Sequence, residues 1–353
     1  MAEAETMRAW RVHAYGAPRE VLRLERAPVP EPGAGELLVC VQAIPLNLND
    51  LERIGGGNMM VRPEFPYAPG MEVLGEVVAA GPGVEDAVGR RVAATTKGAH
   101  GGFAEYAVCP AVSAFDVPET IPVPEAAAVC FPFHLAWLGL VDRADLRAGE
   151  SVLVHAAAGG AGSAAVQLAK QRGARVFATA GGKDKLELCR SLGADVVVDY
   201  RDGDFADVVL AETDQRGVDV VFDGVGEAVL EPSLKAIAYN GRYVMMGFAS
   251  NKAVADEPFL VPRRLMLGNV RLCCVMMAYA PQELVRGMKA GMGWNMIPRD
   301  VGLAAHAEIL AGIESGALRP VVGRTVGFDE LPGAVEDLAN RRSVGRTIAV
   351  VDS

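Results

Sequence analysis

Short runs of apolar and β-branched residues, bounded by glycine and proline, occupy the first third of the chain. Strand-length runs lie at residues 36–43, 71–80 and 91–94, and Pro/Gly-rich segments at 32–35 and 81–83 separate them. Glycine and proline mark turns because they supply backbone conformations that interrupt strands. This part of the chain is therefore predicted to be β-rich.

From about Pro124 the pattern changes to apolar strands that alternate with helical segments. Strands are expected at residues 152–155, 175–180, 196–199, 219–222 and 241–246, with helices at 163–172 and 185–192. Further segments are a strand near residue 270, helices at 281–292 and 302–315, and a final strand at 347–351. Strand–helix alternation implies a parallel sheet covered by helices on both faces, so the fold class is α/β.

A glycine-rich turn joins the first strand of this region to its first helix. It reads Ala157-x-Gly159-x-x-Gly162, which departs from Gly-x-Gly-x-x-Gly only at the first position. In the Rossmann fold, such glycines let the backbone approach a diphosphate and let the helix pack close to the strand. The helix start also offers unpaired N–H groups and a partial positive charge. The predicted diphosphate-binding residues are Gly159, Gly160, Ala161 and Gly162; a tight turn without a ligand is the alternative.

The end of the next strand indicates which dinucleotide binds. An NAD site places Asp or Glu there, about 20 residues after the glycines, to bind the ribose hydroxyl groups. Here the strand ends in Thr179-Ala-Gly-Gly182, and Lys183 and Lys185 follow. The missing carboxylate and the two lysines favour a ribose 2′-phosphate, although lysines at a helix start are often only solvated. NADPH is the expected cofactor.

Composition narrows the functional classes. The 353 residues exceed what one hydrophobic core usually supports, so two domains are expected. A net charge of −10 without a Lys/Arg-rich tract argues against nucleic-acid binding. Six cysteines without a Cys-x-x-Cys pair indicate reduced thiols. No signal peptide or membrane-spanning run is recognised, so the expected location is cytoplasmic.

Several further segments, together with the glycine turn, resemble the zinc-free quinone oxidoreductases of the medium-chain dehydrogenase/reductase superfamily. They are Asn47-Leu-Asn-Asp50, Pro69-Gly-Met-Glu-Val-Leu-Gly75, Gly193-Ala-Asp195 through Arg201, and Asp223-Gly-Val-Gly226. The resemblance covers nearly the whole chain. It implies a GroES-like catalytic domain formed by residues 1–126 and 277–353, with a Rossmann domain at 127–276. It also implies an active site in the cleft between the domains and assembly as a homodimer or homotetramer.

The same resemblance assigns the cofactor contacts. Gly181, Lys185 and Tyr200 would hold the 2′-phosphate. The nicotinamide half would be lined by Val225, Gly247, Phe248 and Cys274, and Asn47 would contact the cofactor or the substrate.

No metal is expected. Where the zinc alcohol dehydrogenases of this superfamily carry zinc ligands, the chain has Asn47, Met71 and Phe131. An amide or a phenyl ring does not replace a thiolate or an imidazole in a tetrahedral zinc site. Cys130 lies one residue from the third position, so a shifted alignment restores one ligand but not three. The four-cysteine structural zinc lobe is absent as well.

Without a Lewis acid or an evident nucleophile, the cofactor carries the reaction. Quinones and related α,β-unsaturated carbonyls (enones) accept hydride without strong activation. The predicted catalytic residues are Asn47, which can donate through its amide, and Asp50, which we expect to orient Asn47 or its loop. A satisfied turn residue is the alternative for each. His134 is a possible proton donor, but its aromatic neighbours favour a structural role.

Two other functions remain open. Reductase domains of polyketide synthases carry a very similar glycine-alanine turn, so an enoyl-thioester reductase is one alternative. A basic strip would suit its carrier-bound substrate, and Arg263-Arg264 and Arg341-Arg342 are the only candidates. The other alternative is a nucleotide-binding structural or interaction protein with little turnover.

Overall fold

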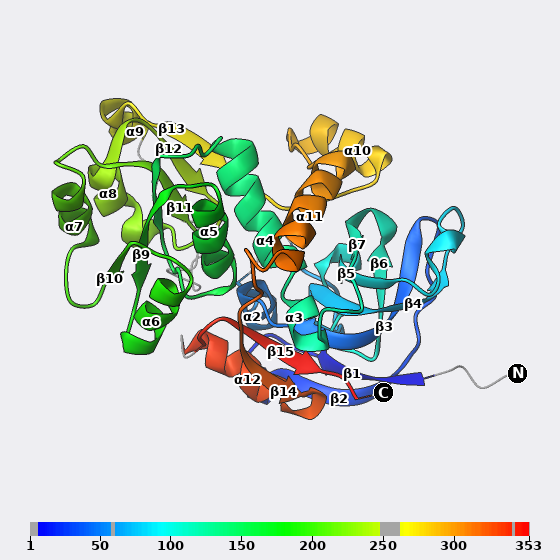
Figure 1. Ribbon diagram of the computed structural model, residues 1–353. Coiled ribbons are helices and arrows are strands. Elements are labelled where there is room, and N and C mark those ends of the chain that lie inside the picture. Colours follow the sequence, from blue (N-terminus) through cyan, green and yellow to red (C-terminus); the bar gives the residue numbers. More distant parts are fainter. Residues whose placement is uncertain (1–5, 58–60, 248–261, 341–342, 353) are drawn as a thin grey trace, which may run out of the picture. The chain divides into compact units, whose positions relative to one another are not determined.

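A computed structural model describes residues 6–57, 61–247, 262–340 and 343–352 (Figure 1). The chain divides into two compact units. The β-rich unit comprises Met1–Cys130, Ala278–His306 and Val322–Ser353, and the α/β unit comprises Phe131–Met277 and Ala307–Val321. The division thus falls after Cys130 and Met277, where the sequence predicts breaks after 126 and 276. The return of Ala307–Val321 to the α/β unit has no counterpart in the sequence pattern.

The α/β unit is built on six parallel strands in the order β10-β9-β8-β11-β12-β13. The strands are β8 (Ser151–Val154), β9 (Arg175–Ala180), β10 (Val196–Asp199), β11 (Val218–Asp223), β12 (Ile237–Met245) and β13 (Arg271–Cys274). Numbered from β8, this order is 3-2-1-4-5-6, that of doubly wound dinucleotide-binding sheets. The expected α/β fold class is confirmed, and the predicted bounds of β9 and β10 match the structure.

Helices connect these strands. They are α5 (Gly160–Gln171), α6 (Lys183–Ser191), α7 (Phe205–Glu212), α8 (Glu227–Ala236) and α9 (Pro262–Gly268); α4 (Cys130–Trp137) and a π-helical turn, η4 (Leu138–Arg143), precede β8. The strands carry continuous apolar runs because both faces of a parallel sheet are covered. The buried side chains of Leu153, Phe177, Val221 and Tyr243 belong to one core cluster of this unit.

Helix α5 begins three residues earlier than the sequence predicts. Glycine lowers helix propensity in a helix interior, so the pattern placed the start after Gly162. In the structure Gly159 is the N-cap residue, and Gly160 and Gly162 lie in the first turn. The first N–H groups of any helix have no acceptor within the helix. Glycine at these positions therefore costs the helix no hydrogen bonds.

The β-rich unit contains a sheet in the order β14-β15-β3-β4-β5-β7, with β6 paired to β3, and a separate β1-β2 hairpin. The strands are β1 (Thr6–Val12), β2 (Leu22–Pro28), β3 (Glu36–Pro45), β4 (Glu72–Ala80), β5 (Arg91–Thr95), β6 (Tyr106–Pro110), β7 (Ala114–Asp116), β14 (Val322–Gly327) and β15 (Arg346–Val350). Because β15 pairs antiparallel with β3, the C-terminal strand completes a sheet that begins near the N-terminus.

Short helices surround this sheet. They are α1 (Pro18–Val21), α2 (Leu48–Gly55), α3 (Val123–Ala127), α10 (Gln282–Met292), α11 (Arg299–Glu314) and α12 (Leu331–Ala339), with 3₁₀ turns η1 (Glu85–Ala87), η2 (Lys97–Ala99), η3 (Ala111–Ser113) and η5 (Phe328–Glu330). The division between the two units falls within α11. The core of the β-rich unit includes Val39, Ile44, Val73, Phe103 and Leu331.

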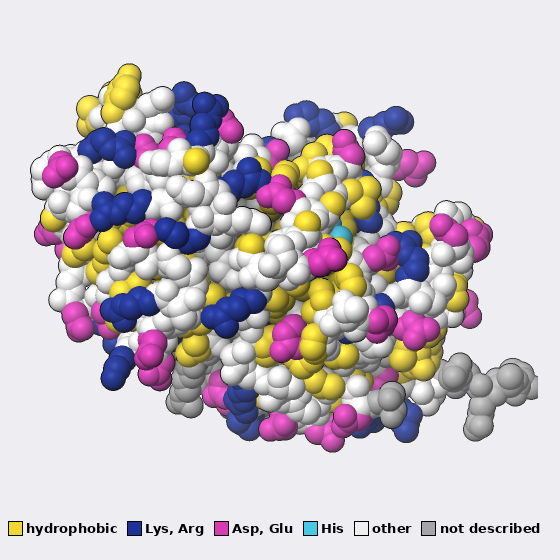
Figure 2. All heavy atoms as spheres, viewed as in Figure 1, with side chains coloured by type: hydrophobic (Ala, Val, Ile, Leu, Met, Phe, Trp, Pro, Cys, Tyr) yellow, Lys and Arg dark blue, Asp and Glu magenta, His cyan; other side chains and the backbone are white. Residues whose placement is uncertain are grey.

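Two observations concern the surface and the helices. On the face drawn in Figure 2, acidic and basic side chains are interspersed. No helix among the described residues is both long enough and apolar enough to cross a membrane.

One close approach fixes the turn between β8 and α5. A Cβ added to Gly162 would lie 2.3 Å from the carbonyl oxygen of Ala156 and 2.7 Å from the Cα of Ala157. These are backbone atoms of the same turn and cannot move aside like a flexible side chain. Gly162 is therefore required by packing, as the sequence predicts.

We expect Gly162→Ala to destabilise the protein, because the added methyl group overlaps backbone. The free energy of unfolding should fall by about 2 kcal/mol or more, measured by denaturant titration. The matched control is Gly287→Ala in α10, where an added Cβ meets nothing within 4 Å. Equal effects of the two substitutions would contradict this packing argument.

Candidate cofactor and active site

The predicted diphosphate residues lie where β8 ends and α5 begins. The first hydrogen bond of α5 runs from the Ser163 N–H to the Gly159 carbonyl, at 2.9 Å. The N–H groups of Gly160, Ala161 and Gly162 therefore have no acceptor within the helix. They lie at the carboxyl end of the central strand, next to the switch point between β8 and β11. A diphosphate fits this arrangement, because anions bind unpaired N–H groups at helix starts.

Gly181 and Tyr200 lie against each other at the ends of β9 and β10. A Cβ on Gly181 would come within 2.7 Å of the Tyr200 hydroxyl oxygen. The ring of Tyr200 is 47% exposed, so this corner is open to solvent. Lys185 lies in the first turns of α6, which begins at Lys183. The structure thus brings the predicted 2′-phosphate residues to two neighbouring strand ends.

Sequence reasoning missed Arg201 at this corner. A Cβ on Gly182 would lie 3.4 Å from Nη2 of Arg201, so the guanidinium flanks the Gly181–Gly182 backbone. Arg201 also forms a bidentate ion pair with Asp199, with Nε–Oδ1 at 2.9 Å and Nη2–Oδ2 at 2.5 Å. This ion pair holds the pKa of Asp199 well below its usual range. The sequence feature that could have indicated this contact is the arginine directly after Tyr200.

The predicted nicotinamide residues follow the next three strand ends. Val225 comes after β11, Gly247 after β12, and Cys274 ends β13, whose register pairs Cys274 with Met245. A Cβ on Gly247 would lie 3.1 Å from the Gly224 carbonyl oxygen, so these two loops are in close contact. Phe248 lies outside the described residues.

Asn47 is the N-cap residue of α2 in the β-rich unit, and the Asp50 side chain reaches back to its backbone. Oδ2 of Asp50 accepts the Asn47 N–H at 3.1 Å, and Oδ1 accepts the Met71 N–H at 3.0 Å. Asp50 therefore holds both the Asn47 turn and the Met71 backbone. Its side chain is completely buried, and burial raises the pKa of the carboxyl group to about 6 against the attraction of Arg53.

The expected donor role of Asn47 needs correction. Its Nδ2 donates to the Pro45 carbonyl at 3.1 Å and to Oε2 of Glu72 at 3.4 Å. Both N–H groups of the amide thus have acceptors inside the protein. Because the two neighbours are acceptors only, they also fix which end of the amide is nitrogen. What Asn47 can offer a ligand is the acceptor capacity of its carbonyl oxygen.

A buried ion pair supports this turn and was not predicted. Nη2 of Arg346, at the start of β15, lies 2.8 Å from Oε2 of Glu72, and both side chains are more than nine-tenths buried. Glu72 in turn accepts from Asn47. Removing one partner would leave an uncompensated charge in the interior. The fixed backbone around Asn47 therefore depends on a residue from the opposite end of the chain.

The positions compared with zinc ligands carry no cluster of metal-binding groups. Met71 accepts a hydrogen bond from Nδ2 of Asn49 through its sulfur, at 3.5 Å. Burial raises the pKa of the Cys130 thiol well above its ordinary value. Within the described ranges, no group of three or more His, Cys, Asp or Glu residues could hold a metal ion. His134 is fully buried in α4.

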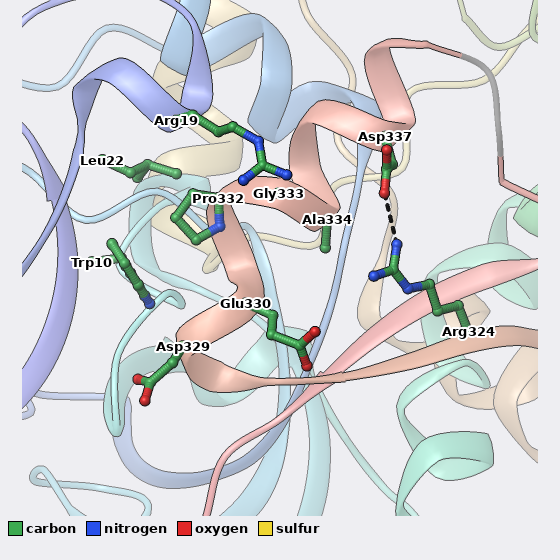
Figure 3. Close-up of a pocket in the computed structure, with 10 residues that line it drawn as sticks. All are labelled: Trp10, Arg19, Leu22, Arg324, Asp329, Glu330, Pro332, Gly333, Ala334 and Asp337. Carbon is green, nitrogen blue, oxygen red and sulfur yellow. Dashed lines mark hydrogen bonds and ion pairs between the residues drawn. The ribbon is translucent and has the colours of Figure 1, made fainter.

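A separate hollow of the β-rich unit holds none of the predicted site residues (Figure 3). It is lined by residues of β1, α12 and their neighbours, including Trp10, Arg19, Glu330 and Gly333. Two of its arginines are already paired, Arg19 with Glu336 and Arg324 with Asp337. We therefore assign the candidate cofactor site to the strand ends of the α/β unit, and consider the Asn47 turn of the β-rich unit separately.

The sheet order and the glycine turn define a dinucleotide-binding protein, and comparisons with known proteins give the family. Residues 33–119 match the alcohol dehydrogenase GroES-like domain, and residues 160–290 match the zinc-binding dehydrogenase domain. The quinone oxidoreductase of Rattus norvegicus is 30% identical over 335 residues, which cover 94% of each chain.

A solved structure and a larger enzyme add to this comparison. Mycobacterial Rv1454c, solved as a complex with NADPH, is 31% identical with a TM-score of 0.83, covering 98% of this chain and 99% of that one. A mycocerosic acid synthase-like polyketide synthase of Mycolicibacterium smegmatis is 36% identical over 229 residues, which are 65% of this chain and 11% of that protein.

The chain belongs to the quinone oxidoreductase family of the medium-chain dehydrogenase/reductase superfamily. The family expected from the sequence is confirmed, as are the GroES-like and Rossmann domain types and the expectation of an oxidoreductase. NADPH, the expected cofactor, is bound by one of the relatives compared.

The buried Asp50 carboxyl group predicts a pH-dependent stability difference. Its pKa is higher in the folded than in the unfolded chain, so protonated Asp50 stabilises the fold at low pH, and this contribution is lost as the pH rises through about 6. Asp50→Asn cannot ionise. Relative to wild type, its free energy of unfolding should therefore rise by roughly 1–3 kcal/mol between about pH 4.5 and about pH 7.

Urea titrations at the two pH values measure this difference. Asp86→Asn, at an exposed acid of the same unit, should track wild type at both values. A gap between Asp50→Asn and wild type that stays constant with pH would contradict the assignment.

Proposed function

We propose that the protein is an NADPH-dependent, zinc-independent reductase that transfers hydride to quinones or related α,β-unsaturated carbonyls. The observation that carries this proposal is the glycine turn at the start of α5. The neighbouring strand β9 ends without a carboxylate, and the nearby Asp199 carboxylate is paired with Arg201. The NADPH complex of Rv1454c and the name of the rat relative support it.

We assign the diphosphate to Gly159, Gly160, Ala161 and Gly162, and the 2′-phosphate to Gly181, Lys185 and Tyr200, with Arg201 added. Arg201 uses Nε and Nη2 on Asp199. A guanidinium has five N–H donors, so Nη1 can still donate to a phosphate. Lys185, in the first turns of α6, adds a second cation to this corner. A cation there favours a phosphate over a hydroxyl group.

Val225, Gly247 and Cys274 are assigned to the nicotinamide half. Two of these loops already meet through Gly224 and Gly247. When bound, NADPH supplies a hydride from C4 of the nicotinamide ring. The protein's part is to hold the ring and to restrict water around it.

In the β-rich unit, we assign Asn47 to a hydroxyl group of the bound cofactor or substrate, through its carbonyl oxygen. Asp50 is a positioning residue, because it holds the Asn47 and Met71 N–H groups and is itself fully buried. The proton that accompanies hydride uptake comes from water. The developing hydroquinone oxygen accepts a proton from water readily. The zinc-independent mechanism rests on the amide, thioether and phenyl groups of Asn47, Met71 and Phe131.

A second candidate, an enoyl-thioester reductase, is favoured by the similarity to the polyketide synthase segment. The basic strip that would suit its carrier receives less support. Arg264 is paired with Glu231 at 2.9 Å, and Arg341 and Arg342 lie outside the described residues. A nucleotide-binding protein with little turnover is the remaining alternative, and the acceptor screen below distinguishes all three.

We also propose a homodimer, or a tetramer built from it, in a reducing compartment such as the cytoplasm. Strand β13 is at the edge of the six-stranded sheet, and a bare edge is a template for pairing with a second copy. Met266, Leu267 and Leu272 on or near this edge are exposed. All six cysteines are free thiols, which suits a reducing compartment.

The open 2′-phosphate corner predicts a strong preference between cofactors. NADPH should bind at least about tenfold more tightly than NADH, measured by fluorescence titration. Lys185→Ala and Arg201→Ala should weaken NADPH binding more than NADH binding. Arg190→Ala, at an exposed position farther along α6, is the control and should change neither. Equal losses of both cofactors in the two test variants would contradict the assignment.

Turnover should depend on the acceptor and not on a metal. An acceptor screen that follows NADPH absorbance with quinones, enones and enoyl thioesters should show the highest kcat/KM for a quinone or an enone. Prior dialysis against a chelator should leave that value unchanged. A preference for enoyl thioesters would favour the second candidate, and NADPH binding without oxidation would favour the non-enzymatic one. Loss of activity that added zinc restores would refute zinc independence.

A further inference from the structure

Two groups of hydrogen-bonded polar side chains lie inside the α/β unit, behind the strand ends of the cofactor site. They contain Thr179, His155, Ser233, Tyr243 and Asp223, all of which are buried to more than nine-tenths. In the first group, Nδ1 of His155 is 2.9 Å from Oγ1 of Thr179, and Nε2 is 2.8 Å from Oγ of Ser233. In the second group, the Tyr243 hydroxyl group donates to Oδ2 of Asp223 at 2.7 Å.

The donors and acceptors fix where the protons lie. The Ser233 hydroxyl donates to the Val229 carbonyl at 2.6 Å, so toward His155 it acts as an acceptor. Nε2 of His155 therefore carries the ring proton, and Nδ1 accepts from Thr179. Burial lowers the pKa of His155 to about 3, so the ring is neutral in this arrangement. Within each group the donors and acceptors match, which favours a single geometry.

The two groups reach the two halves of the cofactor site. His155 directly precedes the glycine turn, and the backbone carbonyl of Thr179 accepts the Ala157 N–H of that turn at 3.0 Å. Asp223 accepts the N–H of Val225 at 2.7 Å and that of Gly226 at 3.1 Å. Helix α8 begins directly after this loop and carries Ser233, so the contact between His155 and Ser233 connects the diphosphate turn with the loop assigned to the nicotinamide half.

Stability alone does not require these polar groups. Burying polar groups costs free energy unless every partner is present, and apolar side chains of similar size would fill the core at less risk. Both groups lie near the carboxyl edge of the sheet, where the ligand of a doubly wound fold binds. Their position there indicates a role in the geometry of that edge.

We propose that Tyr243 and Asp223 are positioning residues for the nicotinamide half, and that His155, through Ser233 on α8, links their loop to the diphosphate turn. In this role the two groups set the loop at Val225 and Gly226 in register with the turn at Gly159–Gly162. The cofactor is then bound as one rigid ligand instead of by its adenosine half alone. This inference rests on the proposed NADPH binding.

The test compares NADPH with 2′-phospho-ADP-ribose, which keeps both diphosphate and 2′-phosphate but lacks the nicotinamide. Their Kd values are measured on the full-length protein by calorimetry. Tyr243→Phe removes only the donor to Asp223. It should weaken NADPH about tenfold and the fragment less than about twofold, so the ratio of the two affinities changes. Tyr239→Phe, in the same strand but 83% exposed, is the matched control and should leave both values unchanged.

Ser233→Ala provides a second variant, should Tyr243→Phe fold poorly. It removes the hydroxyl group that accepts from Nε2 of His155, and it places a good helix former in α8. It should change the ratio of the two affinities in the same direction by about threefold. An unchanged ratio in the folded variants, including an equal loss of both ligands, would overturn the positioning role. A wild-type protein that binds neither ligand would instead refute the proposed function, and the inference would fail with it.

Discussion

The backbone at Gly162 passes so close to the Ala156 carbonyl oxygen that a side chain cannot fit between them. This approach brings the start of α5 directly onto the end of β8, at the point where the order of the sheet reverses. The N–H groups of the first helical turn then face the edge where the other strands also end. Every cofactor contact assigned to the α/β unit depends on this short connection, because the remaining loops are placed relative to it by the sheet register.

In the β-rich unit, the main constraint is that the polar turn at Asn47 must be held in place among buried apolar side chains. Asn47, Asp50 and Glu72 satisfy one another and the local backbone, and Arg346 balances the charge of Glu72. Burying such charges is costly unless they are paired. The Asn47 amide nitrogen already donates to Pro45 and Glu72, and the Asp50 carboxylate accepts two backbone N–H groups, which supports the proposal that Asp50 positions the loop.

Much of the α/β unit could be predicted from the sequence, since parallel strands with two covered faces read as continuous apolar runs. In the β-rich unit, glycine and proline marked the ends of the strands. The glycine turn was recognisable because its spacing reflects local geometry. Arg346 was not found, because its partner is near the other end of the chain and no local pattern reports such a pair. The role of Arg201 could not be inferred from the sequence, because an arginine after a strand usually faces solvent. The donor state of Asn47 depends on Pro45 and Glu72, which only the folded turn brings to it.

The central claim is that the turn at Gly159–Gly162 holds the diphosphate of NADPH. A crystal structure of the protein grown with NADPH tests it most directly. The account predicts diphosphate oxygens within hydrogen-bond distance of the N–H groups of Gly160, Ala161 and Gly162. A well-ordered cofactor bound elsewhere, with this turn filled by the protein's own side chains, would contradict it.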